Sequence, residues 1–317
     1  MFPSRVTGLI VLALMFAPTA PAMEQLEQRA FDLPAGGTVV IDTYRGPITV
    51  MPEDRRDVMI TVRAQAPHKD EAKGRAAIER LDLQMMPRGR ELVVMMRNPR
   101  ETGVRFVWED PARLEIDVEV RVPMHCNLQL RTTEGAITVG SMTGRMTART
   151  EAGTIFFRQI DGSVEAQNKN GDIIVSRCTG PVTLRTVTGD VRIGTVGGQA
   201  VLETLNGDIE VQTAHDLIMA QAAEGNIEAG FAQITDGSRL KTALGNITAT
   251  FNPDEGFQVH ATSRWGRILS ELQLEKTSGG VGRGRLVGRH NGGGPRIDLE
   301  VSGGNVKLAP GRPLFEL

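Results

Sequence analysis

Apolar and polar residues alternate in short runs through the middle of the chain, and each run opens at a glycine. The segments after Gly171, Gly189 and Gly207 read Asp-Ile-Ile-Val, Asp-Val-Arg-Ile and Asp-Ile-Glu-Val. Alternation with a period of two is typical of β-strands that bury one face. The pattern therefore predicts a series of short strands, each preceded by a turn.

These glycines recur every 18 residues in two series that share one register. The first series is Gly135, Gly153, Gly171, Gly189, Gly207 and Gly225, and the second is Gly144, Gly162, Gly180 and Gly198. Gly245, Gly266 and Gly304 open less regular copies. Glycine suits corners where φ is positive or where a side chain would clash. Each repeat is therefore predicted to hold two strands, each opened by a turn.

The two strands of one repeat cannot enclose a core, so we expect the repeats to stack in parallel, ~4.8 Å apart. The predicted inward columns on one wall are Ile137, Ile155, Ile173, Val191, Ile209, Ile227 and Ile247 and, beside them, Val139, Phe157, Val175, Ile193, Val211 and Ala229. The opposing wall is predicted to hold Ala148, Ala166, Leu184, Leu202 and Ala220. We predict an all-β, parallel β-solenoid with two short strands per 18-residue rung. A β-sandwich is the alternative, but it does not require a constant register.

The expected organisation has four parts. Residues 1–22 form a signal peptide, residues 23–125 an N-terminal cap of strands with one helix at 70–80, residues 126–275 the regular repeats, and residues 276–317 a Gly-rich loop with closing strands. The helix is expected because residues 70–80 are rich in helix formers and open on acids. A cap would cover the open strand edges of the first rung, which otherwise recruit other chains.

The first 22 residues have the regions of a secretory signal. A basic start is followed by a mostly apolar run at residues 6–17 and by Ala20-Pro21-Ala22, with small residues at the cleavage positions. The run is shorter than the ~20 residues of a membrane span, and an uncleaved anchor is the alternative. We predict an exported protein of the periplasm or cell surface, with a mature start near Met23 and no later transmembrane segment.

Composition and charge narrow the classes of partner. The 36 Lys and Arg nearly balance 38 Asp and Glu, for a formal charge of -2. This balance gives no electrostatic reason to expect nucleic acid or an anionic membrane as a partner. Ten Phe, two Trp and one Tyr also leave few aromatic platforms for stacking bases or sugars. No nucleic-acid partner is predicted.

Several turn motifs point to a family. Asn/Thr-Gly-Asp-Ile/Val units recur at residues 170–173, 188–191 and 206–209, the chain opens with Arg45-Gly-Pro-Ile-Thr-Val50, one strand ends in Val122-Pro123, and closing motifs stand at 292–297 and 302–306. In these motifs the chain resembles the bacterial "putative adhesin" family of uncharacterised, exported β-solenoid domains. The resemblance covers nearly all of the predicted mature chain. It implies a β-solenoid and a role in surface adhesion, and it implies no catalytic residues, because the motifs are structural turns.

Asp172, Asp190 and Asp208 form one predicted column, which Asn226 and Asn246 continue. Stacked carboxylates could bind a cation, but calcium β-rolls need a Gly-Gly-x-Gly-x-Asp motif in both half-turns, and here only one half carries Asp. Asx turns that cap backbone N–H groups explain the column without a ligand. No metal and no cofactor site is therefore predicted.

Solenoid enzymes that cut polysaccharides use clustered acids, and Asp208 and Glu210 beside Asp190 and Arg192 offer such a cluster. Alternating acids on an exposed strand are more usually a solvated face. The five His are scattered, and no Ser/His/Asp or Cys/His nucleophile set is visible. We predict no enzyme and no catalytic residues, with a polysaccharide hydrolase or lyase as the alternative.

An exported protein with two cysteines invites a disulfide, but the register argues against one. Cys126 falls in a predicted corner column, whereas Cys178 falls in an inward column about three rungs away. Their predicted separation of ~14 Å exceeds the Cα limit of ~7 Å for a disulfide. We predict that the two thiols do not pair and that Cys178 is a small core residue.

Two apolar pairs are predicted on outward positions, Phe156 with Ile174 on one wall and Val201 with Met219 on the other. Scattered surface apolar residues are normal, but adjacent ones also serve as contacts for a partner or for a cap. We expect a non-enzymatic scaffold of the cell envelope that binds an envelope protein or polysaccharide through these pairs. A sensory or regulatory envelope domain is a further alternative.

Overall fold

The computed structural model describes residues 23–66, 78–79, 81–97, 115–235, 237–279 and 284–311, and they form 26 β-strands. The chain divides into two compact units, Met1–Gly153 and Thr154–Leu317, which are described in turn. The predicted signal peptide at 1–22 lies outside the described residues. The predicted helix at 70–80 also lies outside them, except for Ile78 and Glu79, so the N-terminal cap is seen as strands.

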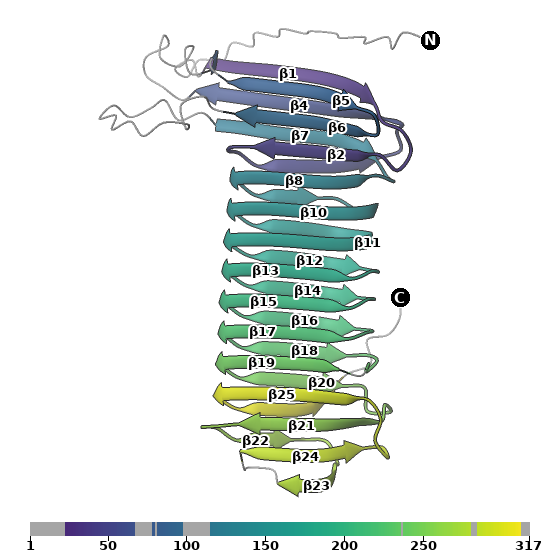
Figure 1. The fold of residues 1–317 in the computed structure, drawn as a ribbon, viewed down its shortest axis with the longest axis vertical. Coiled ribbons are helices and arrows are strands. Elements are labelled where there is room, and N and C mark those ends of the chain that lie inside the picture. The colour runs from purple at the N-terminus through teal and green to yellow at the C-terminus, as the bar shows by residue number, and fades with distance from the viewer. Residues whose placement is uncertain are drawn as a thin grey trace, which may run out of the picture. The chain divides into compact units, whose positions relative to one another are not determined.

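Unit 1 has two walls of strands (Figure 1). The first wall is ordered β5 (Asp82–Arg88), β6 (Glu91–Arg97), β2 (Thr38–Thr43), β8 (Asn127–Glu134) and β10 (Met142–Ala152). The second wall is ordered β1 (Met23–Asp32), β4 (Asp57–Ala66), β7 (Glu115–Pro123), β3 (Ile48–Glu53) and β9 (Ile137–Val139). The parallel strands of each wall bury alternate side chains, as the period of two predicts.

The opening rung of unit 1, β2 with β3, does not lie at the end of the stack. Later strands flank it, because Val39 of β2 pairs with both Leu92 and Leu128, and Ile48 of β3 pairs with both Val118 and Ile137. Beyond this rung, β5 pairs antiparallel with β6, and β1 and β4 add two antiparallel strands to β7. These antiparallel strands cover the edges that the parallel rungs would otherwise expose.

Unit 2 also has two walls, and β11 (Ile155–Asn170) turns the corner between them. After β11, the first wall is ordered β13 (Val182–Thr188), β15 (Ala200–Asn206), β17 (Ile218–Glu224), β19 (Ser238–Leu244), β25 (Arg296–Gly303), β21 (Phe257–Ser263), β24 (Arg285–His290) and β23 (Glu275–Gly279). The second wall is ordered β12 (Ile173–Cys178), β14 (Val191–Val196), β16 (Ile209–Ala214), β18 (Ile227–Phe231), β20 (Ile247–Phe251), β26 (Val306–Pro310) and β22 (Ile268–Ser270). The green and yellow strands of Figure 1 show this succession.

The repeat sets the register of unit 2. Val191 pairs with Ile173 on one side and with Ile209 on the other, and each of the three side chains is fully buried. The next pair, Ile227 with Ile247, carries the two-residue slip that the glycine series showed. The predicted all-β solenoid with parallel 18-residue rungs is therefore confirmed.

The last rungs of unit 2 are out of chain order. β25 and β26 pair with β19 and β20 and also with β21 and β22, so the final rung lies between two earlier ones. The glycine corners follow this order: a Cβ on Gly304 would meet the Gly245 oxygen at 1.9 Å, and one on Gly266 would meet the Gly304 oxygen at 2.0 Å. The sequence places Gly266 before Gly304, and the fold reverses them.

The two glycine series have different physical origins. Gly207 has a φ of 151°, and a Cβ there would lie 2.0 Å from the Gly189 carbonyl oxygen. In the second series, Gly144 and Gly162 also have positive φ, but Gly180 and Gly198 do not. Gly180 is required by space alone, because a Cβ would lie 2.2 Å from the Gly162 oxygen.

A ladder of buried hydroxyl groups runs beside the first glycine series. Each hydroxyl donates to a glycine carbonyl oxygen of the neighbouring rung, which satisfies a buried acceptor. In unit 1 the pairs are Thr132 with Gly46 and Thr150 with Gly135, and in unit 2 they are Thr186 with Gly171, Thr204 with Gly189, Thr242 with Gly225 and Ser263 with Gly304, at 2.7–3.1 Å. This ladder was not predicted.

Candidate functional site

The Asp column of unit 2 is a hydrogen-bonded ladder. The Oδ1 atom of Asp172 accepts the backbone N–H of Asp190 at 2.9 Å, and Asp190 does the same for Asp208. Asp208 accepts the N–H of Asn226 at 2.7 Å, and Asn226 that of Asn246 at 2.9 Å. The Asx-turn interpretation therefore accounts for the column. Within the described ranges, no three His, Cys, Asp or Glu residues are grouped to hold a metal ion.

The acids considered for catalysis are already engaged. Arg192 donates to Asp190 at 2.5 Å and to Asp172 at 3.4 Å. The carboxylate of Glu210 accepts from Gln212 at 3.4 Å. The second oxygen of Asp190 and one oxygen of Asp208 are used by the backbone ladder. This arrangement stabilises the corner and holds the acids to neighbouring protein groups.

Cys126 and Cys178 are both free and buried. Burial raises the pKa of the Cys126 thiol to about 12 and also raises that of Cys178, against the opposing hydrogen bond with Gly180. The thiolate is the reactive form, so we expect iodoacetamide at about pH 8 to label neither cysteine until the protein is denatured. Mass spectrometry of the non-reduced protein should show no peptide that links them. A linked peptide, or labelling of the folded protein at both sites, would contradict the register.

The two predicted apolar pairs lie on opposite walls of unit 2. Phe156 and Ile174 are register partners on β11 and β12 of the second wall, and both are half-buried. Val201 and Met219 are register partners on β15 and β17 of the first wall, and Met219 is 44% exposed. One compact partner cannot contact both pairs, so they do not form a single surface.

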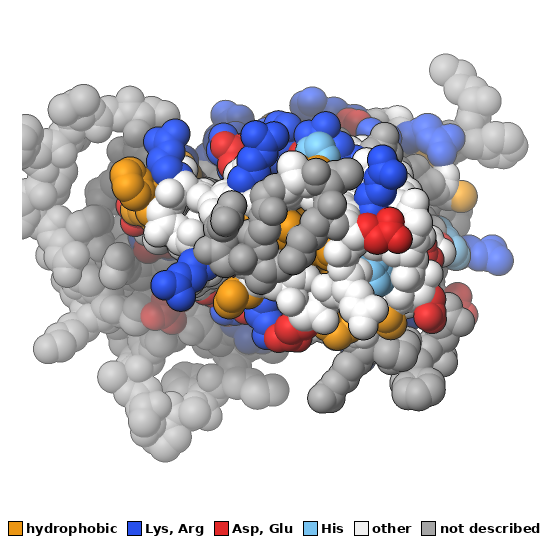
Figure 2. Space-filling view, turned by 90° about the horizontal axis from the view of Figure 1, so that it is seen from below, with side chains coloured by type: hydrophobic (Ala, Val, Ile, Leu, Met, Phe, Trp, Pro, Cys, Tyr) orange, Lys and Arg blue, Asp and Glu red, His pale blue; other side chains and the backbone are white. Residues whose placement is uncertain are grey.

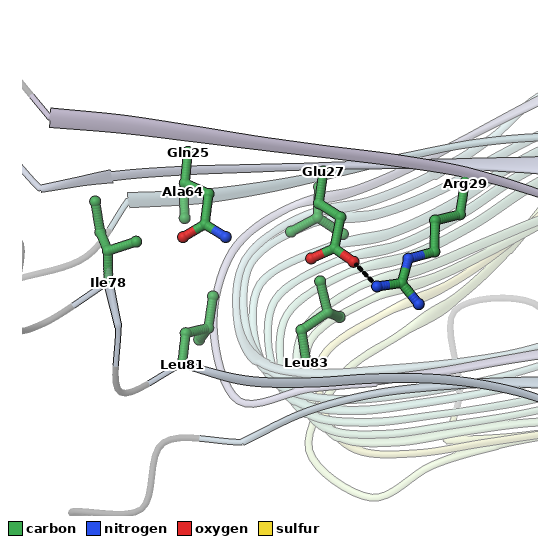
Figure 3. A pocket seen from close by; sticks show the side chains of 8 residues that line it. Gln25, Glu27, Arg29, Ala64, Ile78, Leu81 and Leu83 are labelled. Carbon is green, nitrogen blue, oxygen red and sulfur yellow. Dashed lines mark ion pairs between the residues drawn. The ribbon is translucent and has the colours of Figure 1, made fainter. Parts of the chain in front are cut away.

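A small pocket lies at one end of unit 1, between the edge strands β1 and β5 (Figure 3). Its volume is about 130 Å³, and Val62, Ala64, Ile78, Leu81 and Leu83 supply its apolar lining. The charged residues above it, Glu27 and Arg29, form an ion pair at 2.6 Å. The pocket continues the apolar core between the walls.

The first wall of unit 2 carries a different kind of surface next to Met219. We call it the cationic face: the outward side chains of β19, β25, β21 and β24. Its five cations are exposed: Arg239, Lys241, Arg285, Arg289 and Arg296. Two carboxylates, Asp298 and Glu300, lie among them, so the face is positive although the whole chain is not. Figure 2 views the end where β23 and β24 lie, and Lys and Arg side chains gather along its upper margin.

The ion pairs of the cationic face centre on Asp298. Arg296 contacts it at 2.6 Å, and Arg239 and the His260 ring each lie at 3.9 Å. Lys241 lies 3.6 Å from Glu300. Both carboxylates of β25 are therefore matched by cations of the same face.

A shallow depression of about 220 Å³ lies in the cationic face. Its lining comes from all four strands and includes Arg239, His260, Thr262, Arg285 and Asp298. Pockets that enclose a drug-sized ligand usually measure about 300–1,000 Å³, so this one suits a ligand that lies along the surface. Met219 is the register partner of Arg239, which joins the Val201–Met219 pair to this face.

Sequence reasoning missed the cationic face because of the inserted rung. Arg239 and Asp298 are register partners, yet the chain order gives no sign that their strands are neighbours. The available signal was the alternation at residues 296–300, which read Arg-Ile-Asp-Leu-Glu. This predicts a charged outward face but not its neighbours.

The comparisons with known proteins agree on the fold. No curated protein matches the chain. A "putative adhesin" from Bacteroides fragilis NCTC 9343 shares 14% identity, with 90% of this chain and 97% of that chain covered and a TM-score of 0.40. A "putative lipid binding protein" from Parabacteroides distasonis ATCC 8503 shares 12%, with 89% and 96% covered and a TM-score of 0.44. A "putative adhesin" from Parabacteroides merdae ATCC 43184 shares 10%, with 72% and 96% covered and a TM-score of 0.34.

The family assignment comes from the sequence match. The Toastrack DUF4097 family matches residues 38–309, a span that holds both glycine series, the Asx ladder and the cationic face. This agrees with the resemblance that the turn motifs indicated. The chain belongs to the Toastrack DUF4097 family.

Proposed function

We propose that the protein is an exported, non-enzymatic binding protein of the bacterial cell envelope. The observation that supports this most is the cationic face, where ion-paired carboxylates, exposed arginines and a shallow depression share one wall with an exposed apolar pair. Such a surface offers contacts to a partner without presenting a nucleophile. Among the described residues, no helix is long and apolar enough to cross a membrane.

Export is the first part to test. A protein expressed in its native host should be recovered from the periplasmic or envelope fraction, with a mass that begins near Met23. This follows from the apolar run at residues 6–17 and the small residues at the cleavage positions. Recovery of the unprocessed chain from the cytoplasm would contradict the proposal.

Binding is tested by capture from the native envelope with the mature protein. Val201→Ser with Met219→Ser should weaken capture roughly tenfold or more, since truncation of a real apolar contact costs about 1–3 kcal/mol. Phe156→Ser with Ile174→Ser is the matched change on the opposite wall and should leave capture unchanged. Equal effects of the two double variants would contradict a single binding wall.

The enzymatic alternative has its own test. Wild-type protein is incubated with envelope polysaccharides, and the products are separated by size. Asp190→Asn with Asp208→Asn removes the charges of the acid cluster but keeps one acceptor oxygen at each ladder position. Cleavage by the wild type that disappears in this variant would overturn the non-enzymatic proposal.

A further inference from the structure

We propose that the cationic face binds a carboxylate-bearing polysaccharide, with Arg285 and Arg289 as the residues that contact the carboxylates. This inference rests on the proposed binding function and names the class of ligand. Arginine is suited to the task because its planar guanidinium donates two parallel hydrogen bonds to one carboxylate.

Arg285 and Arg289 are the cations of the face that remain available. Both are exposed on β24, and no ion pair joins either one to a carboxylate in the described part of the chain. Glu275 is the register partner of Arg289, yet their side chains form no ion pair. By contrast, Arg239 and Arg296 are paired with Asp298, and Lys241 with Glu300. A ligand carboxylate would supply the partners that the two β24 arginines lack.

The floor between the charged strands is polar but uncharged at most positions. β21 lies between β24 and β25 and presents Gln258, His260 and Thr262 outward. Amide, imidazole and hydroxyl groups donate and accept hydrogen bonds, as the hydroxyl groups of sugars require. Gln258 is the register partner of Arg289, and Thr262 that of Arg285. Each arginine therefore stands beside a polar group, which matches a chain of hydroxyl groups with carboxylates at intervals.

Spacing favours a polymer over a small anion. Arg285 and Arg289 lie four residues apart on one strand, so their Cα atoms are about 13 Å apart at ~3.3 Å per residue. One carboxylate cannot reach both guanidinium groups. An extended polyanion can use both, and it would run along β24.

Other anionic partners fit this face less well. Insertion into a lipid surface uses exposed apolar side chains, whereas the central position of β24 offers only the half-buried Val287. Nucleic acid carries closely spaced phosphates, which would meet the carboxylates of Asp298 and Glu300. A polysaccharide with separated carboxylates avoids both conflicts.

The test measures binding of the mature protein to alginate and polygalacturonate oligosaccharides, with neutral dextran as a negative probe. Wild-type protein should bind the two acidic polymers but not dextran, and binding should weaken in about 0.5 M salt because exposed charges are screened. Arg285→Gln with Arg289→Gln should reduce the affinity for the acidic polymers at least tenfold without a change in melting temperature. Phosphatidylglycerol vesicles and single-stranded DNA are measured in parallel.

The matched control is Arg158→Gln with Arg177→Gln, which removes two exposed arginines from the second wall of unit 2. It should leave the affinity unchanged. The inference is overturned if both double variants lose binding equally, if the β24 variant still binds as the wild type does, if neither acidic polymer binds, or if vesicles or DNA bind more tightly. Envelope capture that depends on Val201 and Met219, with no binding of acidic polymers, would refute this inference alone. Binding of acidic polymers by an unprocessed cytoplasmic protein would instead refute the proposed function.

Discussion

Replacing Ile209 with aspartate is expected to unfold unit 2 at temperatures where the wild-type protein is stable. Ile209 is fully buried on β16, between its register partners Val191 and Ile227. An aspartate there would leave a carboxylate among apolar side chains without a hydrogen-bond partner. The expected loss exceeds about 4 kcal/mol, a large part of the ~5–15 kcal/mol that stabilises a typical domain.

The loss should extend beyond one rung, because each repeat of a solenoid is stabilised mainly by its two neighbours. Thermal melting followed by circular dichroism checks the change in stability, and hydrogen exchange of the neighbouring strands checks its extent. Glu210→Ala is the matched control on the outward side of the same strand and should change stability by less than about 0.5 kcal/mol. A melting curve for Ile209→Asp that overlays the wild type would refute the stacked core.

Replacing Gly207 with alanine is expected to be nearly as damaging, although it adds only a methyl group. The added Cβ would lie 2.0 Å from the Gly189 carbonyl oxygen and 3.1 Å from Oδ1 of Asp190. The oxygen belongs to the backbone of the next rung, so relief requires the two rungs to separate at this corner. The unfavourable φ of 151° adds to the clash, and together we expect a loss of about 3 kcal/mol or more.

Gly89→Ala separates the effect of φ from the effect of the clash. Gly89 has a φ of 62°, but no atom lies within 4 Å of the position of its Cβ. We expect this variant to cost about 1–2 kcal/mol, the usual penalty for an ordinary residue in the left-handed region. Chemical denaturation of both variants gives the comparison. Equal losses would mean that the close approach of the rungs at Gly207 has no energetic consequence.

The core of the fold was predictable because the repeat fixes both the strand pairing and the buried face. Ile173, Val191 and Ile209 occupy the same position in successive repeats, and the structure pairs and buries all three. The slip between Ile227 and Ile247 was also readable from the glycine series. Where the register is constant, periodicity alone determines the neighbours of each strand.

The order of the last rungs was not predictable from the same signal. Ile297 and Val259 belong to strands with the same alternation, and nothing in that alternation tells which one stacks against Ser238. The cationic face depends on this choice, so its residues could not be grouped. The threonine ladder had a readable signal, because Thr186 and Thr204 are 18 residues apart and each stands three residues before a corner glycine.

The inserted rung of unit 2 has a consequence for how the chain reaches its folded state. Most neighbouring strands are about one repeat apart, but Asn246 and Asn305 are 59 residues apart and still share a hydrogen bond. Closing so long a loop costs more entropy than closing one repeat. The rungs up to β20 can assemble as the chain emerges, whereas β21 and β22 must wait for β25 and β26 to fill the gap. Deleting residues 296–310 would therefore remove a layer from inside the stack, and β21 and β22 would lose the parallel partners that connect them to the rest of the unit.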